Sequence, residues 1–150
     1  MNKAILSLNF MYSMERFATA IYRVQKGGFK EAFISQKMNF AVDNEWQHAS
    51  KLKKRITEFN SKPTGISVLF QMAGSTLGSI SRCFGKPLAL KTDLVIEKRA
   101  VKDYTYFMNT LVLDDQTKLM IKSIIADEES HIKNWQDSIK ILKDKISDNL

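Results

Sequence analysis

Two Glu-x-x-His pairs constrain this sequence more than any other feature. They are Glu45 with His48 and Glu128 with His131, and together they use both histidines of the 150-residue chain. Residues three apart share one face of an α-helix, so each pair can offer a carboxylate and an imidazole to one metal ion. A single pair of this kind is usually a solvated surface pair. Two pairs that use every histidine predict that both helices contribute to a metal site.

Two further glutamates precede these pairs at almost the same distance. Glu15 lies 30 residues before Glu45, and Glu97 lies 31 residues before Glu128. Each half of the chain thus consists of a Glu helix followed by a Glu-x-x-His helix. In both halves the first Glu is followed by an Ala and a Tyr (Ala18 and Tyr22, Ala100 and Tyr104). This faint repeat predicts an all-α fold in which two helical hairpins pair in a four-helix bundle.

Apolar residues recur at helical spacing in four long segments, and we expect one domain over residues 1–150. The first predicted helix ends at Gly27, the second runs from between residues 29 and 35 to about residue 59, and the third spans residues 90–111. The fourth begins after Asp114 and Asp115, which can cap its first turn. Each candidate ligand falls on the apolar stripe of its helix and is therefore expected in the core.

Buried carboxylates in such a bundle need a counter-charge. An unpaired buried carboxylate costs several kcal/mol, and four that converge on one core repel one another unless cations lie between them. None of the four apolar stripes supplies a Lys or an Arg. Four carboxylates and two imidazoles suit two Fe ions or Mn, and Zn can occupy the same ligands. We therefore expect a site for two metal ions with six ligands: Glu15, Glu45, His48, Glu97, Glu128 and His131.

Some residues near the ligands are candidates for hydrogen bonds to them: Tyr22, Tyr104, Asp127 and Asp43. The two tyrosines follow the first glutamate of each half by about two turns. The sequence leaves open whether they donate to the ligands or only fill the core. Metal-bound histidines usually donate their second N–H to a carboxylate. We expect Asp127 to orient His48 across the bundle in this way, and Asp43, or Asn44 beside it, to do the same for His131.

The segment between the two halves has a different character. Residues 66–81 carry no charge, and the apolar run ends near Gly85. It is too short and too rich in Gly and Ser to span a bilayer, which takes about 20 apolar residues. Two interpretations of residues 66–84 stay open: a short crossover helix packed on the bundle, or a segment that touches a membrane or an apolar substrate. We favour the crossover helix, because an interfacial helix usually has a strongly charged polar face.

Composition argues against several other classes. The single Cys83 allows no internal disulfide and no four-cysteine iron site, which favours a reducing cytoplasm. The net charge of +7 comes from basic residues scattered along all the predicted helices. Aromatic residues are not interleaved with them, so we expect a solvated basic surface and no nucleic-acid partner. Asn9 interrupts the N-terminal apolar run, and Glu15 and Arg16 follow it, which argues against a secretion signal.

Several stretches of the chain are similar to one known family. Residues 127–135 resemble the last ligand helix of ferritin-like di-iron proteins. Residues 15–25, 62–64 and 95–104, with the turn at Gly85, resemble the demethoxyubiquinone hydroxylase (Coq7-type) family more specifically. The resemblance covers about residues 14–140 and gives all six candidate ligands a match. The chain differs at Lys102 and Asp103, where the family has a histidine pair, and we expect it to lack the family's further C-terminal segment.

The resemblance implies a ferritin-like four-helix bundle with an extra crossover helix, and a non-haem di-iron oxidoreductase of monooxygenase or peroxidase type. Such a protein uses O2 or peroxide, as quinone-biosynthesis hydroxylases of the Coq7 type do. The alternative is an iron-binding, iron-oxidising or rubrerythrin-like peroxide-detoxifying protein without an organic substrate. With one cysteine there is no rubredoxin-like centre, so electrons come from an external donor. Three further partners stay open: an apolar or quinone-like substrate, a peripheral contact with the inner membrane through residues 66–84, and a second copy of the chain in a homodimer.

Overall fold

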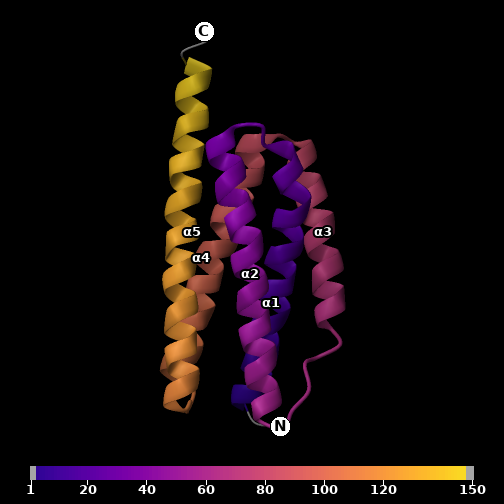
Figure 1. Cartoon of the computed structure of the whole chain (residues 1–150), viewed down its shortest axis with the longest axis vertical. Coiled ribbons are helices and arrows are strands. Elements are labelled where there is room, and N and C mark those ends of the chain that lie inside the picture. Colours follow the sequence, from indigo (N-terminus) through magenta and orange to yellow (C-terminus); the bar gives the residue numbers. More distant parts are fainter. Residues whose placement is uncertain (1–2, 148–150) are drawn as a thin grey trace.

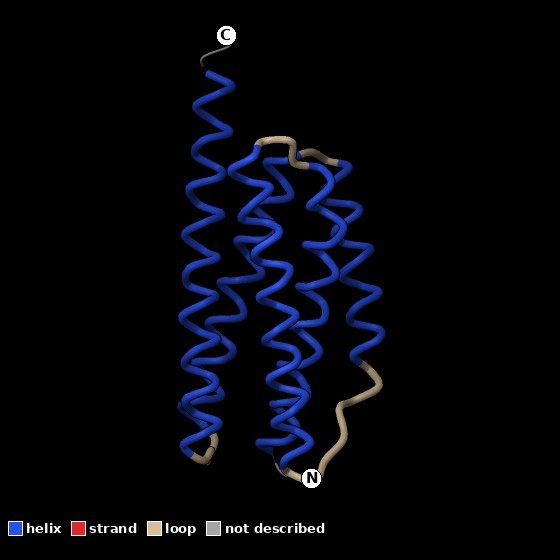
Figure 2. Tube along the Cα trace, viewed as in Figure 1, coloured by secondary structure: helices blue, strands red, loops and turns tan. Residues whose placement is uncertain are grey.

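The structure is a computed structural model that describes the backbone of residues 3–147 and the side chains of residues 3–145. Its helices are α1 (Lys3–Gln25), α2 (Ala32–Glu58), α3 (Ser67–Cys83), α4 (Lys86–Thr110) and α5 (Asp115–Ser147). A 3-10 helix (Lys26–Gly28) follows α1, and the described residues contain no strand (Figures 1 and 2). The predicted all-α bundle, with a crossover helix between the second and third long helices, is therefore confirmed.

The breaks between helices fall where the sequence predicts them. Gly27 and Gly28 end the first helix. Gly85 precedes α4 and has a φ of 98°, a backbone angle that residues other than glycine rarely adopt. Asp114 caps α5, because its Oδ1 accepts a hydrogen bond from the Thr117 backbone N–H at 2.9 Å. This bond satisfies one of the free N–H groups of the first helical turn.

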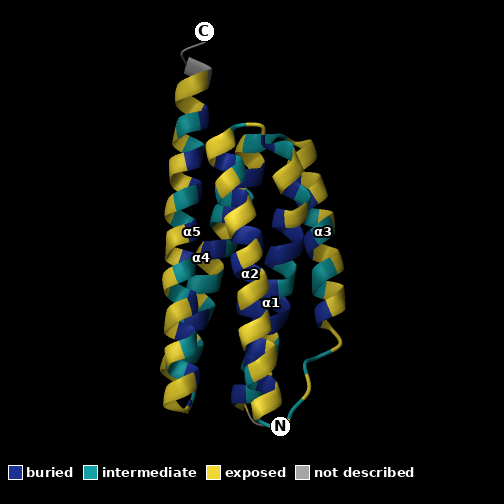
Figure 3. Cartoon of the chain, viewed as in Figure 1, coloured by how far each residue is buried: buried dark blue, intermediate teal, exposed yellow. Residues whose placement is uncertain are grey.

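The chain forms two hairpins, α1 with α2 and α4 with α5, and α3 packs along α1 on the outside of the bundle (Figure 1). Buried residues face the interior and exposed residues face outward (Figure 3). The buried apolar residues form two clusters, one that includes Met38 and Trp135 and one that includes Leu52 and Ile121. On each long helix the candidate ligands fall between these clusters. The ligand layer is thus closed off by apolar side chains toward both ends of the bundle.

Helix α3 packs by its small residues. Its buried residues are Ser67, Gly74, Gly78 and Ser81. A Cβ atom on Gly78 would lie 2.9 Å from the backbone oxygen of Ile21, so α1 and α3 can approach this closely only because the residue is glycine. The large apolar side chains of the segment point outward instead; they include Ile66, Leu69, Met72, Ile80 and Phe84. Within the described residues, no helix combines the length and hydrophobicity that a membrane span requires.

Candidate metal centre

The structure brings all six candidate ligands together in the core. Helix α1 supplies Glu15, α2 supplies Glu45 and His48, α4 supplies Glu97, and α5 supplies the last two, Glu128 and His131. Every one of the six side chains is buried, with at most 3% of its surface exposed. Four helices thus direct acidic and imidazole groups into one layer of the core, and the core on both sides of this layer is apolar.

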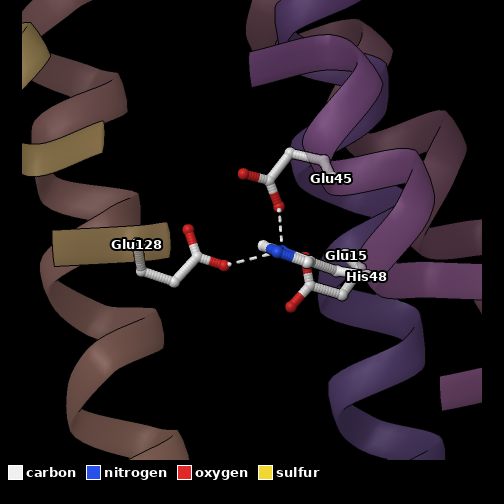
Figure 4. A group of neighbouring side chains, drawn as sticks. All are labelled: Glu15, Glu45, His48 and Glu128. Carbon is white, nitrogen blue, oxygen red and sulfur yellow. Dashed lines mark ion pairs between the residues drawn. The ribbon is translucent and has the colours of Figure 1, made fainter. Parts of the chain in front are cut away.

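The six residues form two overlapping groups. One group consists of Glu15, Glu45, His48 and Glu128, and the other of Glu45, Glu97, Glu128 and His131. Within each group, one ligand atom from every residue lies within 4.8 Å of all the others. Figure 4 shows the first group, in which Glu45 and Glu128 point toward His48 from two different helices. Because Glu45 and Glu128 belong to both groups, they stand where carboxylates that bridge two metal ions would stand.

Each imidazole faces three carboxylates through its Nδ1 atom. His48 Nδ1 lies 3.2 Å from a Glu128 oxygen and 3.6 Å from oxygens of Glu15 and Glu45. His131 Nδ1 lies 2.9 Å from Glu45, 3.2 Å from Glu128 and 3.3 Å from Glu97. A single N–H group cannot satisfy three carboxylates at once. The carboxylates are therefore short of hydrogen-bond donors and of positive charge.

Unsatisfied buried atoms show that the residues fit metal ions. Four atoms of the cluster have no hydrogen-bond partner in the described part of the chain: Glu45 Oε1, His48 Nδ1, Glu128 Oε1 and His131 Nε2. Buried polar atoms are rarely left in this state. Two divalent cations between the carboxylates and imidazoles would occupy such atoms, and hard oxygen ligands with imidazole suit Fe, Mn or Zn.

Without cations, the cluster has to hold protons. Burial raises the pKa of Glu15 to about 8. Burial, and then the charges of Glu45 and Glu97, raise the pKa of Glu128 well above its usual value. Burial alone would lower the pKa of His48, but the carboxylates of Glu128, Glu15 and Glu45 that face its ring raise it far above the usual range. Metal binding at neutral pH therefore has to displace protons from this cluster.

Two tyrosines connect the ligands of one hairpin to the other hairpin. Tyr22 on α1 donates its hydroxyl hydrogen to Glu97 on α4, and Tyr104 on α4 donates to Glu15 on α1. The indole N–H of Trp135 also points to Glu97, at 3.5 Å. The alternatives left open by the sequence are thus both realised, because the tyrosines are buried core residues and also hydrogen-bond donors to candidate ligands.

The two aspartates differ in position. Asp127 Oδ2 lies 3.0 Å from His48 Nε2, so it can accept the N–H of the ring while Nδ1 faces the carboxylates. Asp43 is exposed, and the structure does not bring it to His131. It stands two residues before Glu45, which places it on the opposite side of α2. Sequence patterns gave no sign of Phe40, an exposed residue whose ring packs edge-on at 6.2 Å from that of His131.

A four-helix bundle whose core holds four carboxylates and two Glu-x-x-His pairs has the architecture of ferritin-like di-metal carboxylate proteins. The model of the family described as ubiquinone biosynthesis protein COQ7 matches residues 12–143, and the chain belongs to this family. The family resemblance seen in the sequence is therefore confirmed.

Two curated relatives bear the name 3-demethoxyubiquinol 3-hydroxylase. The chain is 27% identical over 125 residues to the one from Francisella philomiragia subsp. philomiragia, which covers 80% of this chain and 57% of that protein. It is 26% identical over 113 residues to the one from Bordetella petrii, which covers 75% of this chain and 50% of that protein. The chain thus spans only about half the length of the curated relatives it matches.

Proposed function

We propose that this chain is a di-metal oxidoreductase that hydroxylates a quinol-like substrate with O2 and electrons from an external donor. The observation that carries the proposal is the pair of overlapping ligand groups that share Glu45 and Glu128 in a closed core. The names of the two curated relatives support the choice of substrate class. In the balanced reaction one oxygen atom enters the ring C–H bond, and the other leaves as water with two electrons and two protons.

The residues of the chain have separate roles in this proposal. Glu15 and His48 would hold one metal ion, Glu97 and His131 would hold the other, and Glu45 and Glu128 would contribute to both. Two ferrous ions bound there would supply the electrons and open coordination positions for oxygen activation. The tyrosine hydroxyls keep the carboxylates of the two outer glutamates in place across the hairpins. The apolar clusters on either side of the layer exclude bulk water from it.

The exposed apolar side of α3 supports a peripheral contact with a membrane that holds an apolar substrate. Beside its N-terminal end lies a cavity of about 410 Å³, lined by Leu6, Phe10, Ile66 and Phe70 among others. That volume lies in the range of small-molecule sites, which are mostly apolar. Ser13, two residues before Glu15, also lines this cavity. A quinol that reaches the cavity from a bilayer would therefore lie on the outer side of the α1 turn whose inner side carries Glu15.

The function is tested by loading the protein with ferrous iron without oxygen and then adding O2 or peroxide, with and without a quinol. We expect O2 consumption that is coupled to a hydroxylated product only when quinol and reductant are present. Glu128→Gln, prepared in the same way, is expected to give no product. Rapid peroxide turnover without quinol would favour a peroxide-detoxifying protein, and ferric oxide accumulation would favour iron handling. No reaction under any of these conditions would rule out the redox function.

Replacing Leu69 and Met72 with Ser is expected to weaken binding to vesicles. Both side chains are 62% exposed on α3. Burial of one such side chain contributes about 1.5–3 kcal/mol, so the double variant should bind at least roughly ten-fold more weakly. Co-sedimentation with zwitterionic vesicles measures this effect, because such vesicles have no net charge that would attract the positively charged protein. Val95 and Leu119, each 67% exposed on other helices, provide the matched control pair. Equal loss in both double variants would contradict a specific role of α3.

A further inference from the structure

Asp93 is a fifth buried carboxyl group of the bundle, and the six candidate ligands do not include it. It lies on α4, four residues before Glu97, and therefore one turn away on the same face. Its side chain is 0% exposed, and within the described residues neither carboxyl oxygen has a hydrogen-bond partner. A carboxylate in such a place is penalised by several kcal/mol, whereas a neutral acid is tolerated far better.

No described residue makes a hydrogen bond to the Asp93 carboxyl group. Gln25 is fully buried, and its Nε2 donates to Ser81 Oγ at 2.8 Å. Ser81 uses its own proton on the Gly78 carbonyl oxygen at 3.1 Å. Gln25 Oε1 and both oxygens of Asp93 are left without a partner in the part of the chain that the structure describes. All three are acceptors, and the second N–H of the Gln25 amide can serve only part of them, so a proton on Asp93 supplies a donor that the cluster needs.

The electrostatics agree with this geometry. Burial raises the pKa of Asp93 well above its usual value, the Gln25 amide opposes this increase, and the negative charge of Glu97 adds to it. Burial, and then the charge of Glu97, also raise the pKa of the Tyr22 hydroxyl. Asp93 thus shares one face of α4 with Glu97, which accepts the Tyr22 hydroxyl hydrogen.

Asp93 stands between a surface cavity and the metal centre. A cavity of about 280 Å³ lies at this end of the bundle, with Gln25, Lys86 and Ala89 among its lining residues. Ala89 is four residues before Asp93 and shares its face of α4. On the other side, Tyr22 donates its hydroxyl hydrogen directly to Glu97. Polar groups thus follow one another from the cavity to the ligand layer through an otherwise apolar core.

We propose that Asp93 is a neutral, proton-storing carboxyl group that supplies protons from this cavity to the Glu97 side of the metal centre. The proposal rests on the proposed function, in which reduction of oxygen consumes protons. In one delivery the Asp93 O–H bond breaks as its proton goes to the Tyr22 oxygen, and Tyr22 passes its own hydroxyl proton to Glu97, from which the reduction of oxygen consumes it. Solvent at the cavity then returns a proton to the carboxylate past Gln25, and no electron is transferred in either step. Asp93 acts through other residues and does not touch the substrate.

Infrared spectroscopy of the metal-loaded protein tests the protonation directly. We expect the carbonyl stretching band of a protonated carboxyl group in the wild-type protein and its loss in Asp93→Asn. Asparagine has the same size and can donate its amide N–H to Gln25 Oε1, so the fold should be kept. Asp137→Asn changes a 53% exposed carboxylate on α5 and should leave the band unchanged. In D2O the band should shift as the proton exchanges, and Gln25→Leu should slow this exchange.

Kinetics then test the delivery. At unchanged metal content, Asp93→Asn should lower the rate of oxygen consumption roughly 100-fold, the usual size of a lost proton-transfer group. The solvent isotope effect on the remaining rate should increase. A wild-type protein without the band, or an Asp93→Asn variant that keeps it, would overturn the proposal. Wild-type turnover in a variant that has lost the band would overturn the delivery but leave the proposed function intact. A band without any oxygen consumption in the wild type would uphold the neutral carboxyl and defeat the proposed function.

Discussion

Glu128→Gln is expected to empty both metal positions at once. Glu128 belongs to both ligand groups, so its loss removes a negative oxygen ligand from each ion. Changes in residues that merely orient a ligand cost about 10–100-fold in metal affinity, and we expect more than about 100-fold here. After ferrous reconstitution and desalting, the metal content should fall from about two ions per chain, the number that such a bundle core binds, to nearly none. Metal analysis of the purified variants measures this directly.

Two matched variants serve as comparisons for this measurement of metal content. Glu97 belongs to one ligand group only, so Glu97→Gln should lose about one of the two ions. Glu129, the exposed neighbour of Glu128, lies outside both groups, and Glu129→Gln should keep the full metal content. The metal-free Glu128→Gln protein should melt no lower than the metal-free wild type, because one crowded carboxyl group is gone. Full metal content in Glu128→Gln would disprove the shared position of this residue.

The sequence predicted the bundle and the residues of the ligand layer for one physical reason. Helical periodicity places Glu15, Glu45, Glu97 and Glu128 where an apolar residue belongs, and a sequence keeps such costly residues where a function uses them. Asp127 could be predicted for a second reason: a metal-bound histidine usually donates its other N–H to a carboxylate. The structure places Asp127 beside His48. These expectations rest on spacing within one helix or on a general need of the ligands, and both can be read without knowledge of the packing.

Features that depend on how helices meet could not be predicted in this way. An apolar stripe normally marks the buried side of a helix, yet α3 buries its small residues and exposes Leu69 and Phe84. The close approach of α1 at Gly78 decides this, and a sequence does not show which helix will approach a glycine. The repeat of the two halves pairs Glu15 with Glu97 and gives no sign of Asp93, although it precedes Glu97 by one turn. Its burial depends on α1 and α3, which bring Gln25 and Ser81 to it.

The metal-free protein is expected to melt at a lower temperature than the metal-loaded protein, and the difference should increase with pH. In the metal-free folded state, burial raises the pKa of Glu15 and Glu128, and the facing carboxylates raise those of His48 and His131 despite burial. The folded state therefore binds more protons than the unfolded chain between roughly pH 5 and 8, and its free energy of unfolding falls as the pH rises. Glu45 has a lowered pKa and acts in the opposite direction, but only below its ordinary value of 4.5.

The metal-loaded protein should follow the opposite trend, because metal ions compete with protons for the same ligands and bind more tightly as the pH rises. A free metal concentration about 1,000 times the dissociation constant stabilises the folded state by about 4 kcal/mol. For a domain of this size that corresponds to an increase in melting temperature of about 10 °C. Calorimetry of both forms at pH 6 and pH 8, in buffers that do not bind metal, would measure the two trends. Equal melting temperatures at pH 8, or a metal-free protein that becomes more stable from pH 6 to pH 8, would contradict the mutual burial of these carboxylates and imidazoles. The Glu129→Gln variant should reproduce both wild-type curves, since its side chain is exposed and outside the cluster.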